Sequence, residues 1–304
     1  MHRKPFFFFL YFLFSAGFIR AQDTTLLNML KDSMTAQLPA GHVAGTFKAG
    51  RIVNMQTVES PAKGALDFLI QHRFGQLNSG AYNFFGLDNA TLRLGLEYGL
   101  TDRLAAAIGR SSYQKTFDGS LKYKLFLQGA GRGGFPFSAS LLGTISNYTQ
   151  DNPEETFLNA TYRTAYCSQI LIARKFSRRL SVEISPTYLH YNLVPTAADK
   201  NDQFALGMGA RFKISNRMSL NAEYDWLLSN PLVSVTHYNS FSVGWDIETG
   251  GHVFQLVCTN SQGLTESQYI GQTSGNWGNG GIYFGFNISR NFNIGKHAKK
   301  AWAG

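Results

Sequence analysis

Charged side chains at alternate positions are the first candidates for chemistry in this chain. Lys122 and Lys124 are spaced by two residues, and so are Glu223 and Asp225. Residues two apart lie on the same face of a β-strand. The charges on the polar side of such segments are Asp67, Arg73, Arg93, Glu97, Lys122, Lys124, Glu183, Arg211, Lys213, Glu223, Asp225, Asp246 and Glu248. Six are basic and seven acidic, a balance that favours ion pairs and argues against strong selectivity for anions or cations.

A hydrolase would need a serine or an aspartate beside a histidine. The chain has seven histidines, but the sequence contains neither an HExxH metal motif nor a GxSxG nucleophile motif. His190 and His252 lie on strand-like segments, where only the fold could bring a partner to them. We therefore predict no catalytic residue, no metal and no cofactor. An envelope hydrolase with an unrecognised Ser–His or Asp–His pair stays open as an alternative.

These residues belong to segments in which apolar and polar residues alternate. In TLRLGLEYGL, residues 91–100, leucines alternate with Arg93, Glu97 and glycines. A period of two is typical of β-strands with two unlike faces. The twelve segments with this pattern are 66–74, 91–100, 104–112, 120–128, 136–147, 157–175, 180–193, 203–214, 218–228, 239–248, 252–261 and 281–291. The chain is therefore predicted to be all-β, with about 12 strands.

The connections between these segments alternate in length. Short turns such as 101–103 and 215–217 alternate with longer loops such as 75–90 and 262–280. Outer-membrane barrels have short periplasmic turns and longer extracellular loops, and a soluble β-sandwich has no need of this asymmetry. The sequence favours a closed antiparallel transmembrane β-barrel in the bacterial outer membrane. A secreted soluble β protein is the alternative.

The two faces of each strand then have different surroundings. The apolar rows face outer-membrane lipid, and the thirteen charged residues line the lumen. Aromatic residues at strand ends are expected to form interfacial girdles, with Tyr98 and Trp245 on the periplasmic side and Tyr188 and Trp226 on the outer side. A barrel of about 12 strands has a lumen between the filled interior of 8-stranded barrels and the open channel of 16-stranded ones.

Four regions are predicted along the chain. Residues 1–21 combine a basic start, a Phe-rich apolar run and small residues, which is the pattern of a cleaved signal peptide, and the run is too short for a membrane anchor. Residues 22–63, which begin with a short amphipathic helix, lie in the periplasm or enter the lumen as a plug. Residues 64–292 form the barrel. Residues 293–304 form a basic tail.

Charge and cysteine content restrict the partners. Removal of residues 1–21 leaves 25 basic and 19 acidic residues, a net charge of +6. Basic blocks with interleaved aromatic residues are absent from the sequence, so we predict no binding of nucleic acid. Cys167 and Cys258 fall on the sixth and eleventh predicted strands. They are too far apart in a closed barrel for a disulfide, and we expect two free, buried thiols.

Several stretches of the sequence resemble an uncharacterised β-barrel family of Bacteroidota that carries a domain-of-unknown-function label. They are LDFLIQHRFG (66–75), YNFFGLDNATLRLGLEYGLTDRLAAAIGRSSYQKTFDGSLKYKL (82–125), NAEYDW (221–226), FSVGWDIETGGHVFQLVCTNSQGLTESQYI (241–270) and GGIYFGFNISRNF (280–292). The resemblance covers most of residues 43–292. It implies an outer-membrane barrel, and it brings no established activity and no catalytic residue.

Three functions remain open at this point. The favoured one is a narrow or gated pore for small solutes. If residues 22–63 form its plug, Lys48 and Arg51 would pair with lumen carboxylates. The second is a structural or partner-binding barrel that contacts an envelope protein through loops 75–90 and 262–280. The third is the hydrolase. The sequence specifies neither the solute nor the oligomeric state.

Overall fold

A computed structural model describes residues 43, 45–129, 134–151, 153, 157–249 and 251–295. Backbone contacts divide the chain into Met1–Gln37 and Leu38–Gly304, and all described residues belong to the second unit. The predicted signal peptide and amphipathic helix, and the tail from residue 296 on, lie outside the described residues.

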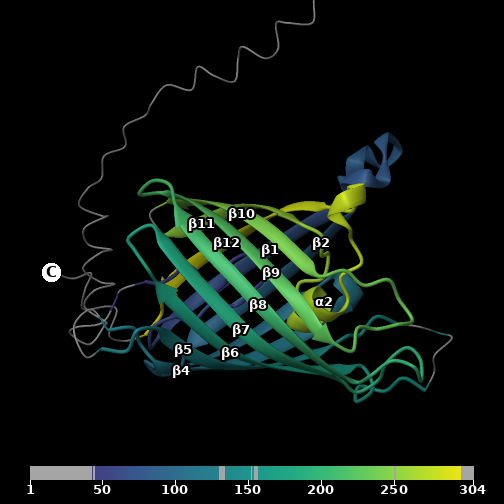
Figure 1. Ribbon diagram of the computed structural model, residues 1–304, viewed down its shortest axis with the longest axis horizontal. Helices are drawn as coiled ribbons and strands as arrows, with labels where there is room; N and C mark the ends of the chain where they lie inside the picture. Colours follow the sequence, from purple (N-terminus) through teal and green to yellow (C-terminus); the bar gives the residue numbers. More distant parts are fainter. Residues whose placement is uncertain are drawn as a thin grey trace, which may run out of the picture. The chain divides into compact units, whose positions relative to one another are not determined.

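Twelve antiparallel strands close into a barrel in which each strand pairs with its neighbours in sequence and β1 pairs with β12 (Figure 1). The strands are β1 (Ala65–Gln76), β2 (Ala90–Gly99), β3 (Leu104–Ser111), β4 (Phe117–Phe126), β5 (Ser138–Asn147), β6 (Thr164–Lys175), β7 (Leu180–Tyr191), β8 (Asp202–Lys213), β9 (Met218–Ser229), β10 (Ser240–Thr249), β11 (His252–Thr259) and β12 (Tyr283–Asn293). Closure pairs Ile70 of β1 with Ile288 of β12. The predicted closed barrel of about 12 strands is confirmed.

The observed strands differ from the predicted ranges by one or two residues at most ends, and by more at two strands. Residues 157–163 form turns ahead of β6 rather than its first part. β4 starts at Phe117, and an irregularity in its pairing between Lys124 and Phe126 turns Phe126 outward, where it is 41% exposed. A bulge of this kind inserts one residue and reverses the faces beyond it. The alternation in the sequence had instead placed Leu125 outward.

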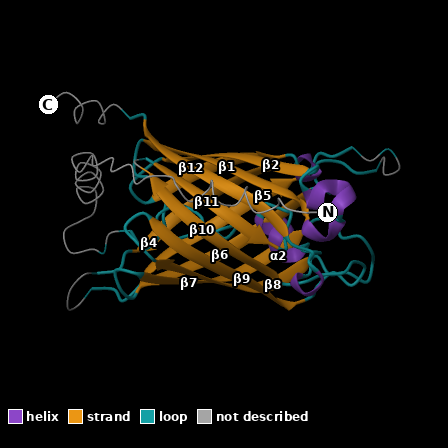
Figure 2. Cartoon of the chain, turned by 90° about the horizontal axis from the view of Figure 1, so that it is seen from above, coloured by secondary structure: helices purple, strands orange, loops and turns teal. Residues whose placement is uncertain are grey.

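The two ends of the barrel differ, as the connection lengths predicted (Figure 2). One end carries the turns 100–103, 176–179 and 214–217, residue 251, and residues 127–129 and 134–137, and we call it the short-turn end. The other, the long-loop end, carries 77–89, 112–116, 148–151, 157–163, 192–201, 230–239 and 260–282. The short helices η1 (Leu77–Ser79), η2 (Ala81–Gly86), η3 (Tyr113–Lys115), α2 (Glu266–Gly271) and η4 (Trp277–Asn279) all belong to these longer loops. Among the described residues, no helix has the length and apolarity that crossing a bilayer requires.

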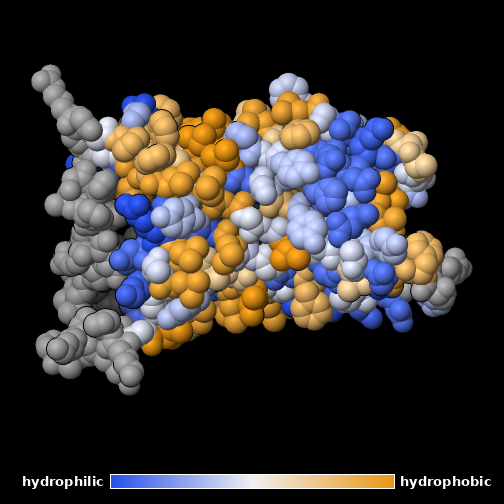
Figure 3. Space-filling view, turned by 90° about the horizontal axis from the view of Figure 1, so that it is seen from below, coloured by the Kyte–Doolittle hydropathy of each residue, from blue (hydrophilic) through white to orange (hydrophobic). Residues whose placement is uncertain are grey.

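Apolar side chains face outward from the barrel wall (Figure 3). Leu92, Leu94 and Leu96 of β2 are 38%, 43% and 40% exposed. Thr91 and Arg93, which alternate with them, are each 3% exposed. This is the reverse of a soluble sandwich, in which the apolar rows are buried between two sheets. It is the arrangement expected where hydrocarbon replaces water around a closed sheet.

A charge on this exterior is expected to destabilise the barrel. Leu94 lies near the middle of β2, so we expect Leu94→Arg to lower the free energy of unfolding by about 2–4 kcal/mol relative to the wild type. Leu94→Ala, which shortens the side chain without adding charge, is the control and should cost clearly less. Urea unfolding of the protein in lipid vesicles measures both. Equal stability of the two variants would contradict a lipid-facing Leu94.

Candidate functional site in the barrel lumen

Residues 45–60, which we call the lumen hairpin, occupy the inside of the barrel. The segment enters at the short-turn end, where Lys175 Nζ donates to Gly45 O at 2.9 Å. It leaves at the same end, where Gly64 N donates to Gly99 O at 2.9 Å. Between these points the chain turns back on itself, because Thr57 N–H donates to Gly50 O, also at 2.9 Å. The tip of the hairpin therefore lies deep in the lumen.

Glu223 of β9 holds this tip. Its Oε2 accepts the backbone N–H groups of Val53 (2.9 Å) and Met55 (3.0 Å), and its Oε1 accepts that of Asn54 (2.8 Å). Consecutive N–H groups in a tight turn make a concave binding site for an anion. The carboxylate is 1% exposed. One buried acid thus satisfies three backbone donors that would otherwise lie unpaired in the lumen.

The rest of the lumen hairpin is also bound through its main chain. The N–H of Val58 donates to Glu183 at 2.9 Å. The carbonyl groups of the hairpin accept hydrogen bonds from side chains of the wall. The donors are Lys122 (to Glu59 O, 2.9 Å), Lys124 (to Ser60 O, 3.3 Å), Gln255 (to Ile52 O, 2.7 Å) and Asn287 (to Val53 O, 3.0 Å). Acidic side chains therefore hold its N–H groups, and lysine and amide side chains hold its C=O groups.

The loop between β11 and β12 enters the lumen from the long-loop end. Its helix α2 lies within the outline of the barrel in both ribbon views (Figures 1 and 2). All six residues of α2 are buried, and Tyr191 of β7 donates its hydroxyl to Ser267 O at 2.6 Å. This part of loop 262–280 is therefore not available for the external contacts predicted for it. We call residues 261–276 the inward loop.

The lumen hairpin and the inward loop meet inside the barrel. Arg51 Nη2 lies 3.3 Å from Glu266 Oε1, and their side chains are 8% and 4% exposed. Gln56 Nε2 donates to the same oxygen at 3.2 Å. The lumen is therefore filled from both ends by segments that contact each other. The hairpin's Lys48 also pairs with Glu248 of β10 at 3.4 Å, as expected of a plug.

All thirteen predicted lumen residues fall on the inner face of their strands. Some of them form ion pairs with one another, and others form hydrogen bonds with neutral groups. Ion pairs join Arg93 to Asp118, Lys122 to Glu97, and Arg211 to both Asp246 and Glu248. Arg73 donates to Asn54 and Asn287, both at 2.9 Å, and Asp67 accepts from Asn291. Lys124 binds the hairpin, and Lys213 is half-buried beside the exposed Phe212. Asp118 was missed because β4 begins earlier than the alternation indicated.

Three acidic residues, Glu183 of β7 with Glu223 and Asp225 of β9, have no lysine or arginine within ion-pair distance among the described residues. We call them the acid patch. Asp225 is 0% exposed, and neither of its carboxylate oxygens has a hydrogen-bond partner in the part of the chain described. Glu183 uses one oxygen for Val58 and leaves the other unpaired. The acid patch therefore keeps three carboxylate oxygens without a hydrogen-bond partner among the described residues.

Two glycines of β8 make room for the lumen hairpin over this patch. The strand pairing places Gly209 between Glu183 and Glu223, and Gly207 between Ser185 and Asp225. Met55 Cε lies 2.8 Å from the point that a Cβ of Gly207 would occupy, and Ile52 lies over Gly209. Apolar hairpin side chains therefore cover a polar wall.

The four predicted girdle residues lie on the exterior. Tyr188 and Trp226, 37% and 48% exposed, lie close to the long-loop ends of β7 and β9. Tyr98 is the next-to-last residue of β2, at the short-turn end. Trp245 is 44% exposed but lies nearer the middle of β10 than its predicted place at a strand end, beside Leu220 and Leu256. The girdles stay a prediction.

An Asp–His pair, as the hydrolase alternative requires, exists outside the lumen. His190 Nδ1 lies 2.7 Å from Asp202 Oδ1, which also accepts the Tyr188 hydroxyl at 2.6 Å. The pair is on the outward face at the long-loop end, and its side chains are 35% and 52% exposed. In the described contacts, no serine or threonine hydroxyl binds His190.

The outer loops are tied together beside the inward loop. Asp199 accepts the N–H groups of Val233 (2.7 Å) and Ser234 (3.2 Å). Hydrogen bonds, mainly that of the Ser234 hydroxyl, lower the pKa of Asp199 to about 2, so Asp199 stays charged at neutral pH.

A second contact joins the loop before β10 to the inward loop. His237 Nε2 lies 3.0 Å from Ile270 O, and burial lowers the pKa of His237 below its usual value.

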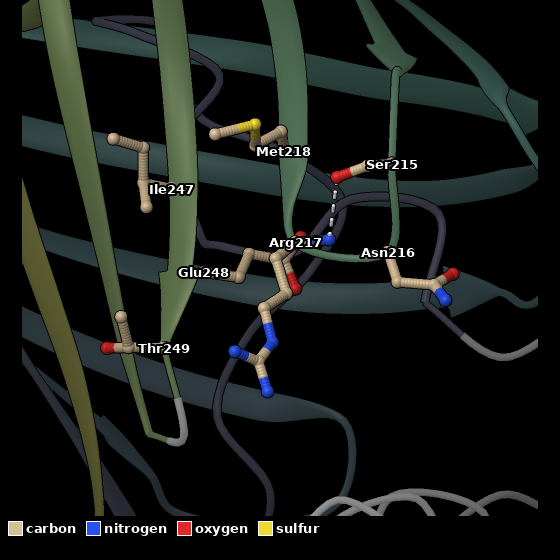
Figure 4. Close-up of a pocket in the computed structure, with 7 residues that line it drawn as sticks. All are labelled: Ser215, Asn216, Arg217, Met218, Ile247, Glu248 and Thr249. Carbon is tan, nitrogen blue, oxygen red and sulfur yellow. Dashed lines mark hydrogen bonds between the residues drawn. The ribbon is translucent and has the colours of Figure 1, made fainter. Parts of the chain in front are cut away.

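Other features do not form a site. A surface pocket at the short-turn rim is lined by the β8–β9 turn and the end of β10 (Figure 4), and its acid, Glu248, is already paired with Arg211 and Lys48. The described residues contain no group of three or more His, Cys, Asp or Glu side chains that could hold a metal ion. Cys167 and Cys258 are free as expected, but Cys258 is half-buried rather than buried.

The closed sheet, its apolar exterior and its charged interior define an outer-membrane β-barrel protein. The chain belongs to the family described as membrane bound beta barrel domain (DUF5777), whose model matches residues 47–292. No curated protein matches the sequence.

Several solved structures are similar to the chain. The NanC porin is 9% identical, with a TM-score of 0.45, over 75% of this chain and 98% of that one. The COG4313 outer membrane channel from Pseudomonas putida F1 is 13% identical, with a TM-score of 0.46, over 81% and 100%. The outer membrane phospholipase A from Escherichia coli is 13% identical, with a TM-score of 0.41, over 74% and 89%.

The contact between the lumen hairpin and the inward loop can be measured by a double-mutant cycle. Because Arg51 and Glu266 are buried and 3.3 Å apart, we expect Arg51→Ala and Glu266→Ala to show a coupling energy of about 1–3 kcal/mol in urea unfolding. The more exposed Lys48–Glu248 pair, at 30% and 12%, is the control, with an expected coupling below about 1 kcal/mol. No coupling between Arg51 and Glu266 would mean that the two segments do not meet.

Proposed function

We propose that the protein is a gated pore for small solutes and that the lumen hairpin is its gate. The observation that carries the proposal is the binding of three hairpin N–H groups by the single carboxylate of Glu223. This contact holds a segment that is not a strand of the barrel in the path that a solute would take. The state described here is then the closed one.

The way in which the hairpin is held supports its release. Its main-chain hydrogen bonds to the amide side chains of Gln255 and Asn287 each contribute about 0.5–1.5 kcal/mol net, and those to charged side chains such as Glu223 about 1.5–3 kcal/mol. In the closed state Ser185, Asp225 and Ser240 keep buried polar atoms without partners among the described residues. An unpaired buried polar atom costs about 1–3 kcal/mol, and water would satisfy it once the hairpin left. Hydration of these atoms therefore offsets part of the cost of withdrawing the apolar side chains of the hairpin, such as Ile52 and Met55, from the lumen.

The path of the chain also supports release. Both ends of the lumen hairpin lie at the short-turn end, near Lys175 and Gly99. The hairpin can therefore withdraw through that end without threading past the wall. The pairings that close the barrel run between β1 and β12 and do not include it. Opening then requires no break in the sheet.

Loss of the donors to Glu223 is expected to open the pore. In the full-length chain, Val53→Pro with Met55→Pro removes two of the three N–H groups, because proline has no amide hydrogen. We expect the wild type to be mostly silent in a planar lipid bilayer and the double variant to show repeated conductance steps. Ala49→Pro is the matched control, since the described contacts give its N–H no acceptor. A double variant that folds and stays silent would refute the gated pore.

A covalent link should have the opposite effect. A Cβ at position 209 would lie 3.6 Å from Ile52 Cγ1, so the side chain of residue 52 contacts β8 at this position and a disulfide between the two positions would tie the hairpin to the wall. We therefore expect Ile52→Cys with Gly209→Cys, combined with the two proline substitutions, to be silent when oxidised and to conduct after reduction. Conduction that is the same before and after reduction would show that the hairpin is not the gate.

A further inference from the structure

The acid patch is only partly satisfied by the lumen hairpin. Glu183 and Glu223 accept N–H groups from it. Asp225 accepts none, although it is 0% exposed. A carboxylate buried with neither a donor nor a cation is strongly unfavourable. The barrel wall therefore has carboxylate oxygens that could accept hydrogen bonds but have no donor among the described residues in the closed state.

The strand pairing places these carboxylates in two adjacent rows of the wall. Glu183, Gly209 and Glu223 form one row across β7, β8 and β9, and Ser185, Gly207 and Asp225 form the next. Because the two glycines have no side chains, they leave a groove between Glu183 and Ser185 of β7 on one side and the two acids of β9 on the other. Asp225 Oδ1 lies 3.0 Å from the point that a Cβ of Gly207 would occupy, and Ser185 Oγ borders the same point.

A third strand adds a further unused group to this site. Ser240 of β10 pairs with Asp225 in the register. The hydroxyls of Ser185 and Ser240 are both 0% exposed and have no partner among the described residues. Ser185 and Asp225 border the groove, Ser240 lies on the other side of Asp225, and the hairpin's Met55 and Ile52 now fill the groove.

Among the described residues, no lysine or arginine forms an ion pair with an acid of this patch. Arg93, Lys122 and Arg211 are paired with other carboxylates. Arg73 donates to Asn54 and Asn287 instead. Withdrawal of the lumen hairpin thus removes the N–H donors of Glu183 and Glu223 and leaves the three acids of the patch without an ion-pair partner.

We propose that, once the lumen hairpin withdraws, the acid patch and the groove over Gly207 and Gly209 bind the cationic group of a solute, an ammonium or a guanidinium. This inference rests on the proposed function. Such groups present several N–H donors to carboxylates, as the hairpin's three amides now do at Glu223. Hairpin and solute then compete for Glu223, so that cation binding favours the open state.

The test is the block of K⁺ current by ethylguanidinium in the full-length Val53→Pro, Met55→Pro protein, with uncharged ethylurea as the matched probe. Ethylguanidinium is expected to block at a concentration about tenfold lower than ethylurea does. Asp225→Asn should remove most of that difference. The substitution breaks no hydrogen bond of the described structure, so the barrel should fold. Asp202→Asn on the exterior is the control and should keep the full difference.

The outcomes separate the two proposals. Equal block by the two probes, or an unchanged preference in Asp225→Asn, would overturn the acid patch as a cation site and leave the gated pore intact. Absence of any conductance in the double proline variant would overturn the pore itself, and the inference with it.

Discussion

The contact between the Glu223 carboxylate and three backbone N–H groups of the lumen hairpin is the interaction on which the closed lumen depends. A turn placed inside a barrel has amide groups that no strand can pair. Buried N–H groups without acceptors are costly, so a segment of this kind stays in a lumen only if the wall supplies acceptors. Glu223 supplies three of them from one side chain, at a depth where water does not compete.

The rest of the lumen is built around that contact. Gly207 and Gly209 remove the side chains that would collide with Met55 and Ile52. Residues with amide or ammonium groups, such as Asn287 and Lys122, donate hydrogen bonds to the carbonyl oxygens of the hairpin. The wall therefore binds both the N–H groups and the C=O groups of the hairpin main chain. These polar contacts act together with apolar packing, because Phe47, Ile52, Val53, Met55 and Val58 of the hairpin belong to one hydrophobic cluster with wall residues such as Leu171 and Leu189.

Much of the barrel could be predicted from the sequence, because the two faces of a strand are a local property. In residues 91–100 every second side chain is apolar, and these are the side chains found outside. The charged residues on the other face lie inside for the same reason. The bulge near Lys124 was not predictable in this way, since an inserted residue changes the register without an evident signal in the alternation.

The candidate site depended on contacts between distant parts of the chain. Val53 and Glu223 are 170 positions apart, and residues 45–60 have no periodicity that would place them. Loop 262–280 is rich in Gly, Ser and Asn, as exposed loops are, although its Tyr269 and Ile270 are fully buried. Which acids have an ion-pair partner also depends on the strand pairing, which places Arg93 near Asp118 and leaves Asp225 without a partner among the described residues. A count of charges along the chain does not give these pairings.

Amide hydrogen exchange of the full-length protein in lipid vesicles tests the central claim most directly. If Glu223 holds the hairpin tip in the resting state, the amides of Val53, Asn54 and Met55 should exchange roughly a hundredfold or more slowly than those of an unstructured peptide. Exchange of these three amides at the rate of an unstructured peptide, alongside protected amides in β9, would contradict a lumen closed by residues 45–60.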